Sequence, residues 1–155
     1  QEKDPERGPD EGVRAGQFHS REQYRYWQSV STRWKDNDAY GHINNAVYYS
    51  YIDSVVNQFL IEHQLLDIQK SDSIGLVVQS QCRFFQPLSY PGRVDCGLRV
   101  TDLGNSSVSY EVGMFAEAEA AAAAVGGFTH VFVDREARRP CALSVPVRSV
   151  LQSLV

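Results

Sequence analysis

The sequence of 155 residues is poor in long apolar runs, in basic clusters and in cysteine, and each shortage argues against a class of protein. No apolar run approaches the roughly 20 residues that a membrane-spanning helix needs. The first residues lack the apolar core of a secretory signal. We therefore expect a soluble intracellular protein, working in the cytoplasm without a membrane partner. Because the chain starts at Gln1, removal of an upstream segment and import into an organelle stay open.

The three cysteines, Cys82, Cys96 and Cys141, are odd in number and widely separated. Each lies in apolar or strand-like sequence, which is typical of reduced structural thiols and not of a disulfide framework or a zinc site. The sequence also lacks a glycine-rich phosphate loop, a spaced set of metal ligands and a Ser-His-Asp pattern. We expect neither a metal nor a redox cofactor.

An excess of basic residues is also missing. The chain has 15 Lys and Arg against 19 Asp and Glu, which gives a net charge of −4. A nucleic-acid-binding face needs clustered positive charge, so nucleic acid is not an expected partner. The hydrophobic fraction of 43% is ordinary for a globular protein, and the length suits a single domain.

Five segments alternate apolar and polar side chains as half-buried strands do. They span residues 26–34, 74–85, 93–103, 107–116 and about 122–134. The run AEAEAAAAA at 116–124 has high intrinsic helix propensity. Because it lies between two strand-like segments, we predict a turn near 117–120 and then a return strand, with pairing overriding local preference.

One long helix is predicted over residues 46–63, and apolar side chains cover most of its circumference. Such a helix must be wrapped by other elements. One strand, one buried helix and four more strands predict an α+β fold in which an antiparallel sheet of about five strands curls around a central helix. A short helix over 147–154 should lie on the sheet. Residues 1–22 are polar and charged and should form a flexible arm ahead of a single domain over 23–155.

The densest group of hydrogen-bonding side chains lies where the first strand gives way to the long helix, in the stretch WKDNDAYGHINNAVYYSY. Its polar half holds Asp36, Asn37, Asp38, Gly41, His42, Asn44 and Asn45. The first N–H groups of a helix lack intrahelical partners and carry partial positive charge, so they stabilise an anion. If Asn44 or Asn45 caps the helix, these amides face a space lined by Asp38 and His42. A carboxylate that activates water beside a donor that polarises a carbonyl suits acyl transfer to water.

The string DNDAYGHINN at 36–45, followed by Tyr48, resembles the acyl-CoA thioesterases of the 4-hydroxybenzoyl-CoA thioesterase-like, hotdog-fold family. The resemblance covers residues 26–151 and implies that Asp38 is the catalytic carboxylate, acting as a base for water or as a nucleophile. It also implies that the amides opening the helix polarise the thioester carbonyl. Plant acyl-carrier-protein thioesterases have a similar run, with Asn where this chain has Tyr40.

By this resemblance the catalytic set is Asp38, His42 and Asn45, in which His42 orients the carboxylate or contacts the thioester and Asn45 supplies a backbone amide. The expected substrate contacts are Tyr40, Asn44, Tyr48, Arg138 and Arg139. The two arginines would hold the nucleotide phosphates of CoA, as surface Arg or Lys does near this strand end in related enzymes.

Each of these residues also has a purely structural interpretation. Asp38 is a favoured turn or cap residue ahead of a helix, His42 suits a turn, and the arginine-rich segment 135–139 suits a solvated turn. Asp36 is interpreted as the residue that holds the turn. Asp53 is a rival catalytic carboxylate, because another branch of hotdog thioesterases carries its carboxylate on the central helix, but its polar stripe is explained equally by a solvated face.

The pattern therefore predicts an acyl-CoA thioesterase of lipid metabolism that releases a free acid and CoA, with CoA entering only as part of the substrate. Members of the family cover their open sheet edges by pairing. We expect a homodimer or a dimer of dimers with active sites at the subunit boundary. Two alternatives stay open: a hotdog-type enoyl-thioester hydratase or dehydratase, and a non-catalytic acyl-CoA-binding dimeric domain.

Overall fold

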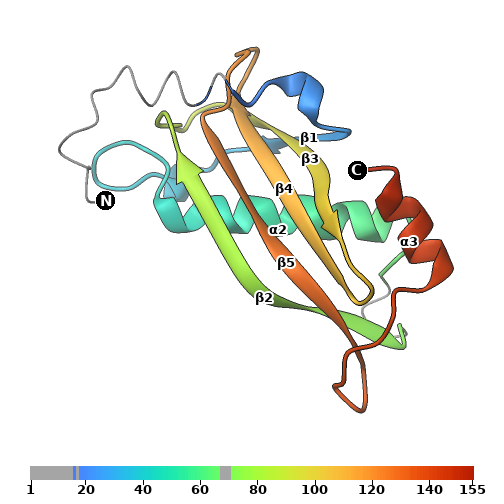
Figure 1. Ribbon diagram of the computed structural model, residues 1–155. Coiled ribbons are helices and arrows are strands. Elements are labelled where there is room, and N and C mark those ends of the chain that lie inside the picture. The colour runs from blue at the N-terminus through green and yellow to red at the C-terminus, as the bar shows by residue number, and fades with distance from the viewer. Residues whose placement is uncertain (1–15, 17, 67–70) are drawn as a thin grey trace, which may run out of the picture.

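The computed structural model describes residues 16, 18–66 and 71–155. Its elements in chain order are η1 (Arg21–Gln23), β1 (Tyr26–Ser31), η2 (Trp34–Asp36), α2 (Asn45–Glu62), β2 (Ser73–Phe84), β3 (Arg93–Leu103), β4 (Ser107–Ala116), β5 (Ala124–Asp134) and α3 (Val145–Gln152). Figure 1 shows the strands as one curved sheet with α2 lying along one face. This is the α+β hotdog architecture that the sequence predicts.

The five strands are ordered β1-β3-β4-β5-β2, and every pair is antiparallel. The helix α2 carries the chain from β1 at one edge of the sheet to β2 at the other. The alanine-rich segment joins the sheet as predicted: Ala124 pairs with Met114 on one side and Phe84 on the other. Pairing on both sides outweighs the helix propensity of alanine, because each strand residue gains neighbours that a surface helix would not provide.

The core lies between α2 and the inner face of the sheet. The helix buries Tyr48, Tyr51, Ile52, Val55, Val56, Phe59 and Leu60. They pack against inward-facing strand residues such as Leu98, Val112 and Phe128. Full burial of a large apolar side chain contributes about 1.5–3 kcal/mol, so this packing fixes α2, and with it the position of its N-terminus.

The strand β2 departs from the unbroken alternation that the sequence suggests. Its register against β5 shifts between Val77 and Gln79, which is a β-bulge. One extra residue places Phe84 on the inner face and Leu76 on the outer face, although their spacing alone would put them together. The strand also leaves Leu76, Val77 and Val78 exposed by 39%, 52% and 61%.

The arm predicted over residues 1–22 lies mainly outside the described residues. Its end, from His19 onward, contacts the sheet, where Arg21 forms an ion pair with Asp95 at 2.9 Å. The packed part of the chain therefore includes residues ahead of the predicted boundary at 23. In the ranges 18–66 and 71–155, no helix combines the length and the hydropathy needed to cross a bilayer.

Candidate active site

The chain between β1 and α2 folds into a compact turn that presents the start of the helix. The predicted first strand over 26–34 ends earlier, at Ser31, and Trp34 is already the first residue of η2. Gly41 has a φ of +81°, which residues with side chains rarely adopt, and this lets the loop reverse. The reversal is closed by a 2.7 Å hydrogen bond from Asp38 N to His42 O.

Asp36 anchors this turn to the protein interior and is only 1% exposed. Its carboxylate accepts hydrogen bonds from Arg33 N at 2.8 Å, Arg33 Nη2 at 3.1 Å and Tyr51 Oη at 2.7 Å. Burial alone would raise the pKa of Asp36, but the hydrogen bonds from Tyr51 and Arg33 and the arginine charge hold it below the usual value. Asp36 thus ties the end of β1 to α2, which confirms its structural interpretation.

Asp38 presents one carboxylate oxygen to the protein and leaves the other available. Oδ1 accepts hydrogen bonds from Tyr40 N at 2.8 Å and His42 N at 3.3 Å. Within the described residues, Oδ2 makes no hydrogen bond. The group of His42 that orients Asp38 is therefore its backbone amide, while its imidazole lies exposed.

A hollow of about 290 Å³ opens beside Asp38. It is lined by Asp38, His42, Ile43, Asn45, Tyr48, Phe84, Phe85, Gln86 and Pro87. Asn44 is the N-cap of α2: its side-chain oxygen accepts from Ala46 N at 3.0 Å, and its carbonyl accepts from Val47 N at 2.9 Å. Among the described residues, the Asn45 N–H has no partner. The first residue of the helix, at its positive end, and a carboxylate residue therefore line one hollow.

The inner wall of the hollow is aromatic. Tyr48 is 2% exposed and meets Phe84 edge-to-face with ring centroids 4.9 Å apart. Its hydroxyl oxygen accepts a 3.3 Å hydrogen bond from Leu88 N, and burial raises the pKa of Tyr48 to about 12. The phenol stays protonated at neutral pH, so it can donate a hydrogen bond to a ligand in an otherwise apolar wall.

The family follows from a match over most of the chain. A family model described as the thioesterase-like superfamily matches residues 32–152. The chain belongs to the thioesterase-like superfamily. Membership supports thioester hydrolysis as the general class of activity. No sequence among the curated proteins matches this thioesterase-like chain.

Solved structures give the same fold. The PA5185 protein from Pseudomonas aeruginosa strain PAO1 is 51% identical, with a TM-score of 0.84 over 87% of this chain and 94% of that one. The gentisyl-coenzyme A thioesterase BH1999 is 20% identical, with a TM-score of 0.71 over 81% and 99% of the two chains. The 1,4-dihydroxy-2-naphthoyl-CoA thioesterase Slr0204 from Synechocystis is 16% identical, with a TM-score of 0.75 over 83% and 96%.

In this thioesterase-like chain, four of the predicted site residues meet at the hollow: Asp38, His42, Asn45 and Tyr48. Tyr40 does not line the hollow. Its side chain is 88% exposed, and only its backbone N–H contacts the site, through Asp38. Asn44 is outside the lining as well, because its side chain is the helix cap.

Arg138 and Arg139 lie at the opposite end of the sheet from the hollow. Along the β2–β5 pair, Phe84 faces Ala124 and Ser73 faces Asp134. Eleven strand steps separate the two ends, which is roughly 35 Å at about 3.3 Å per residue. The arginines follow Asp134 and therefore do not reach the hollow of this chain.

The rival carboxylate Asp53 lies on the exposed face of α2, where its Oδ1 accepts a 2.9 Å hydrogen bond from Asn57. It does not line the hollow. The lining residues that the sequence did not single out are Ile43, Phe85, Gln86 and Pro87. Pro87 marks where the chain leaves the sheet, but no signal in the sequence places this strand end beside the start of α2.

A second hollow, of about 250 Å³, lies on the outer face of the sheet above Gly127. Gly127 lies so close to the neighbouring strand that a Cβ there would collide with the Tyr110 carbonyl oxygen. One carboxylate of this hollow, that of Glu111, already binds Arg99 at 2.7 Å. The lining also includes the exposed carboxylate of Asp102, but none of the described lining residues opens a helix, so this carboxylate has no helix N-terminal amide beside it.

Proposed function

We propose that this protein is an acyl-CoA thioesterase that hydrolyses an acyl-CoA to a free acid and CoA. The observation that carries the proposal is that Asp38 and Asn45 line the same hollow, and that among the described residues Asp38 Oδ2 and the Asn45 N–H have no hydrogen-bond partner. A general base and an oxyanion donor are the two groups that thioester hydrolysis needs most. Two structural neighbours named as thioesterases of aromatic acyl-CoA esters support CoA as the carrier.

In the proposed reaction the thioester carbonyl oxygen accepts a hydrogen bond from the Asn45 N–H. Asp38 takes a proton from a water molecule as the water oxygen attacks the carbonyl carbon. The tetrahedral oxyanion is stabilised by the amide and the helix dipole until the C–S bond breaks and CoA leaves as a thiolate, which is then protonated. Direct attack by Asp38, giving an anhydride that water hydrolyses, uses the same geometry. His42 lines the hollow and is proposed to contact the thioester.

We also propose that the substrate site is completed by a second copy of the chain. β2 is an edge strand, and its three successive apolar residues Leu76, Val77 and Val78 are exposed. Open backbone groups and apolar side chains on a sheet edge favour pairing with another strand. Antiparallel pairing of two β2 strands gives a homodimer, alone or as half of a dimer of dimers.

The position of the arginines fits this pairing. If two antiparallel β2 strands pair with the symmetry axis near Val78, the middle of Ser73–Phe84, then Phe84 of one copy lies opposite Ser73 of the other. Phe84 lines the hollow, so the hollow faces the end of the sheet at which Ser73 pairs with Asp134.

The turn that follows β5 holds its arginines at that end. Arg138 N donates to Asp134 O, and Asp134 N donates to Arg139 O, both at 2.9 Å. Arg138 and Arg139 of the partner subunit would then flank the hollow, where their guanidinium groups suit the phosphates of CoA.

A subunit-complementation experiment tests this sharing. The double variant Arg138→Ala/Arg139→Ala should raise KM for acyl-CoA about tenfold or more, because hydrogen bonds to charged groups contribute about 1.5–3 kcal/mol each. When it is mixed with Asp38→Asn during refolding, each mixed dimer has one intact site, so low-KM activity should return to about a quarter of the wild-type level. A mixture that behaves as the sum of its two parents would contradict a shared site.

The activity itself is tested with a panel of acyl-CoA esters, aliphatic and aromatic, saturated and 2-enoyl, by following release of the CoA thiol. We expect thiol release from at least one class of ester. Loss of the ultraviolet absorbance of 2-enoyl esters without thiol release would select the hydratase instead. Binding of CoA esters in calorimetry without turnover of any member of the panel would select a binding domain.

A further inference from the structure

Residues 18–24, here called the N-terminal strap, cross the outer face of the sheet on the side away from α2. Arg21 fixes the strap: its guanidinium pairs with Asp95 at 2.9 Å and donates to the carbonyls of Glu119 at 2.6 Å and Ala116 at 3.1 Å. The same guanidinium lies 4.9 Å from the centre of the Phe115 ring. Contacts this numerous hold the strap in one place.

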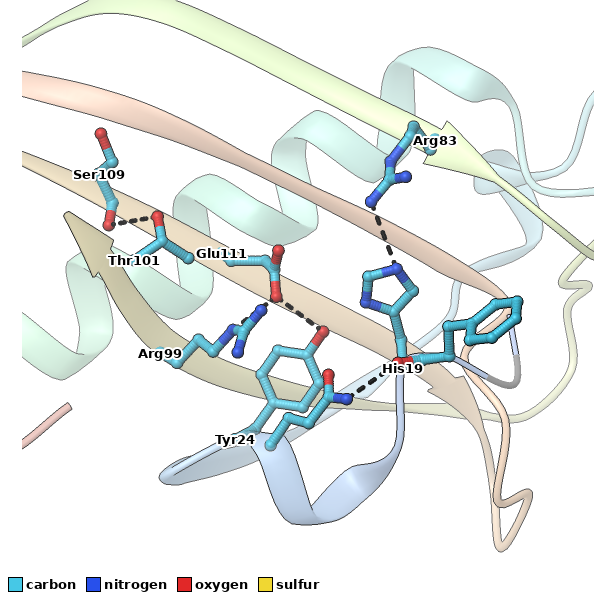
Figure 2. Close-up of polar contacts among 9 residues, drawn as sticks. His19, Tyr24, Arg83, Arg99, Thr101, Ser109 and Glu111 are labelled. Carbon is cyan, nitrogen blue, oxygen red and sulfur yellow. Dashed lines mark hydrogen bonds and ion pairs between the residues drawn. The ribbon is translucent and has the colours of Figure 1, made fainter. Parts of the chain in front are cut away.

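The sheet also has a socket for the strap. Tyr24 is 5% exposed and packs over Gly97 and Gly113, where an added Cβ would approach its side chain to 2.7 and 2.5 Å. Its hydroxyl donates to Glu111 at 3.2 Å, and Figure 2 shows Arg99 meeting the same carboxylate. The Tyr24 ring fits only because both strands have glycine at these two positions, so the strap is packed as an integral part of the fold.

His19 connects the strap to the candidate active site. Its ring stacks on Phe85 with centroids 5.7 Å apart and an interplanar angle of 16°. Its Nε2 lies 3.3 Å from Arg83 Nη2, a contact drawn in Figure 2, and the Arg83 guanidinium carbon lies 5.7 Å from the centre of the Phe85 ring. His19 and Arg83 therefore both contact Phe85.

Phe85 is at the same time one of the residues that line the hollow of Asp38. It is the first residue after β2, and Phe85 N and Gln86 N both donate to the Ala123 carbonyl, at 2.8 and 3.0 Å. The backbone of this wall is thus fixed by the sheet. The orientation of the Phe85 ring depends on the side chains that pack against it. These are His19 and Arg83 on one hand and, on the other, the outer-face cluster of Tyr24, Phe115, Ala122 and Val125.

We propose that His19 is a positioning residue for the acyl site. By stacking on Phe85 it sets the width of the hollow, and so the affinity for the acyl group, without touching the reacting atoms. This role rests on the proposed thioesterase function. The neutral imidazole suits the task, because it can accept a hydrogen bond from Arg83 Nη2 while its flat face packs on the phenyl ring.

The test compares three variants with the wild type on the acyl-CoA panel. His19→Ala should raise KM about three- to tenfold, the range expected for loss of an aromatic pair, with kcat within about twofold. His19→Phe retains the stack and should restore KM. Phe18→Ala is the matched control: it removes a neighbouring strap side chain that is 78% exposed, and it should leave both constants unchanged.

A readout independent of turnover is amide hydrogen exchange at Phe85 and Gln86, which should be faster in His19→Ala than in Phe18→Ala. An active wild type whose KM and exchange are unaffected by His19→Ala would overturn the positioning role alone. A fall in kcat and a rise in KM that are the same in His19→Ala and His19→Phe would also overturn it, since the aromatic ring of the phenylalanine would then have restored nothing. A wild type that releases thiol from no ester would remove the proposed function and this role with it.

Discussion

Replacing Asp38 with asparagine is expected to lower kcat for acyl-CoA hydrolysis by about 10²- to 10⁴-fold, the usual contribution of a general base. The amide can still accept the hydrogen bonds that Tyr40 N and His42 N donate to Oδ1, so the loop should keep its shape. The variant loses the negative charge of the carboxylate and its ability to take a proton from water. Release of the CoA thiol from the best ester of the panel gives the measurement.

Asp53→Asn is the matched control for this experiment. It removes the same charge from the exposed face of α2, outside the hollow, and should leave kcat within about twofold because surface substitutions rarely matter. Unchanged thermal unfolding of both variants would show that neither disturbs the fold. Turnover of Asp38→Asn equal to that of Asp53→Asn would remove Asp38 from the mechanism.

Replacing Asp36 with alanine is expected to lower the free energy of unfolding by about 2–4 kcal/mol, because it removes several hydrogen bonds to a buried charged acceptor and leaves the buried Tyr51 hydroxyl without a partner. The carboxylate accepts hydrogen bonds from the Arg33 backbone, the Arg33 side chain and the Tyr51 hydroxyl, and is 1% exposed. Without it the buried hydroxyl loses its acceptor, and the turn before α2 loses its anchor. Urea unfolding followed by circular dichroism measures the change.

Tyr51→Phe is the milder comparison, because it removes one hydrogen bond and leaves the Arg33 pair in place. Its cost should be about 1 kcal/mol. Since the hydrogen bonds hold the pKa of Asp36 below its ordinary value of 3.8, its stabilisation is complete above that pH and declines as the pH falls further. An Asp36→Ala variant destabilised by no more than Tyr51→Phe would contradict the anchoring role.

Much of the fold could be predicted from local patterns. The bounds of β3 and β4 are those that alternation predicts, and α2 begins within a residue of its predicted start because Asn44 is a good cap. The alanine-rich segment shows where local preference is insufficient. There the correct strand prediction rested on the neighbouring strands and not on its own composition.

The site was predictable to the extent that it is local. Asp38, His42 and Asn45 lie within eight residues of one another, so a single turn and cap bring them to one hollow. Tyr40 belongs to the same turn, yet its side chain points outward, because Asp38 uses the Tyr40 backbone N–H. Phe85 reaches the hollow from a distant strand end, and no local pattern predicts such a contact.

The sequence by itself determined the elements, the helix cap and the loop that fixes one oxygen of Asp38, because these depend on side-chain period and on hydrogen bonds between near neighbours. Only the tertiary structure decided that a bulge in β2 turns Phe84 inward and that the Arg138 turn lies at the far end of the sheet. Strand register is set by packing between distant segments, and a shift of one residue exchanges the two faces of a strand.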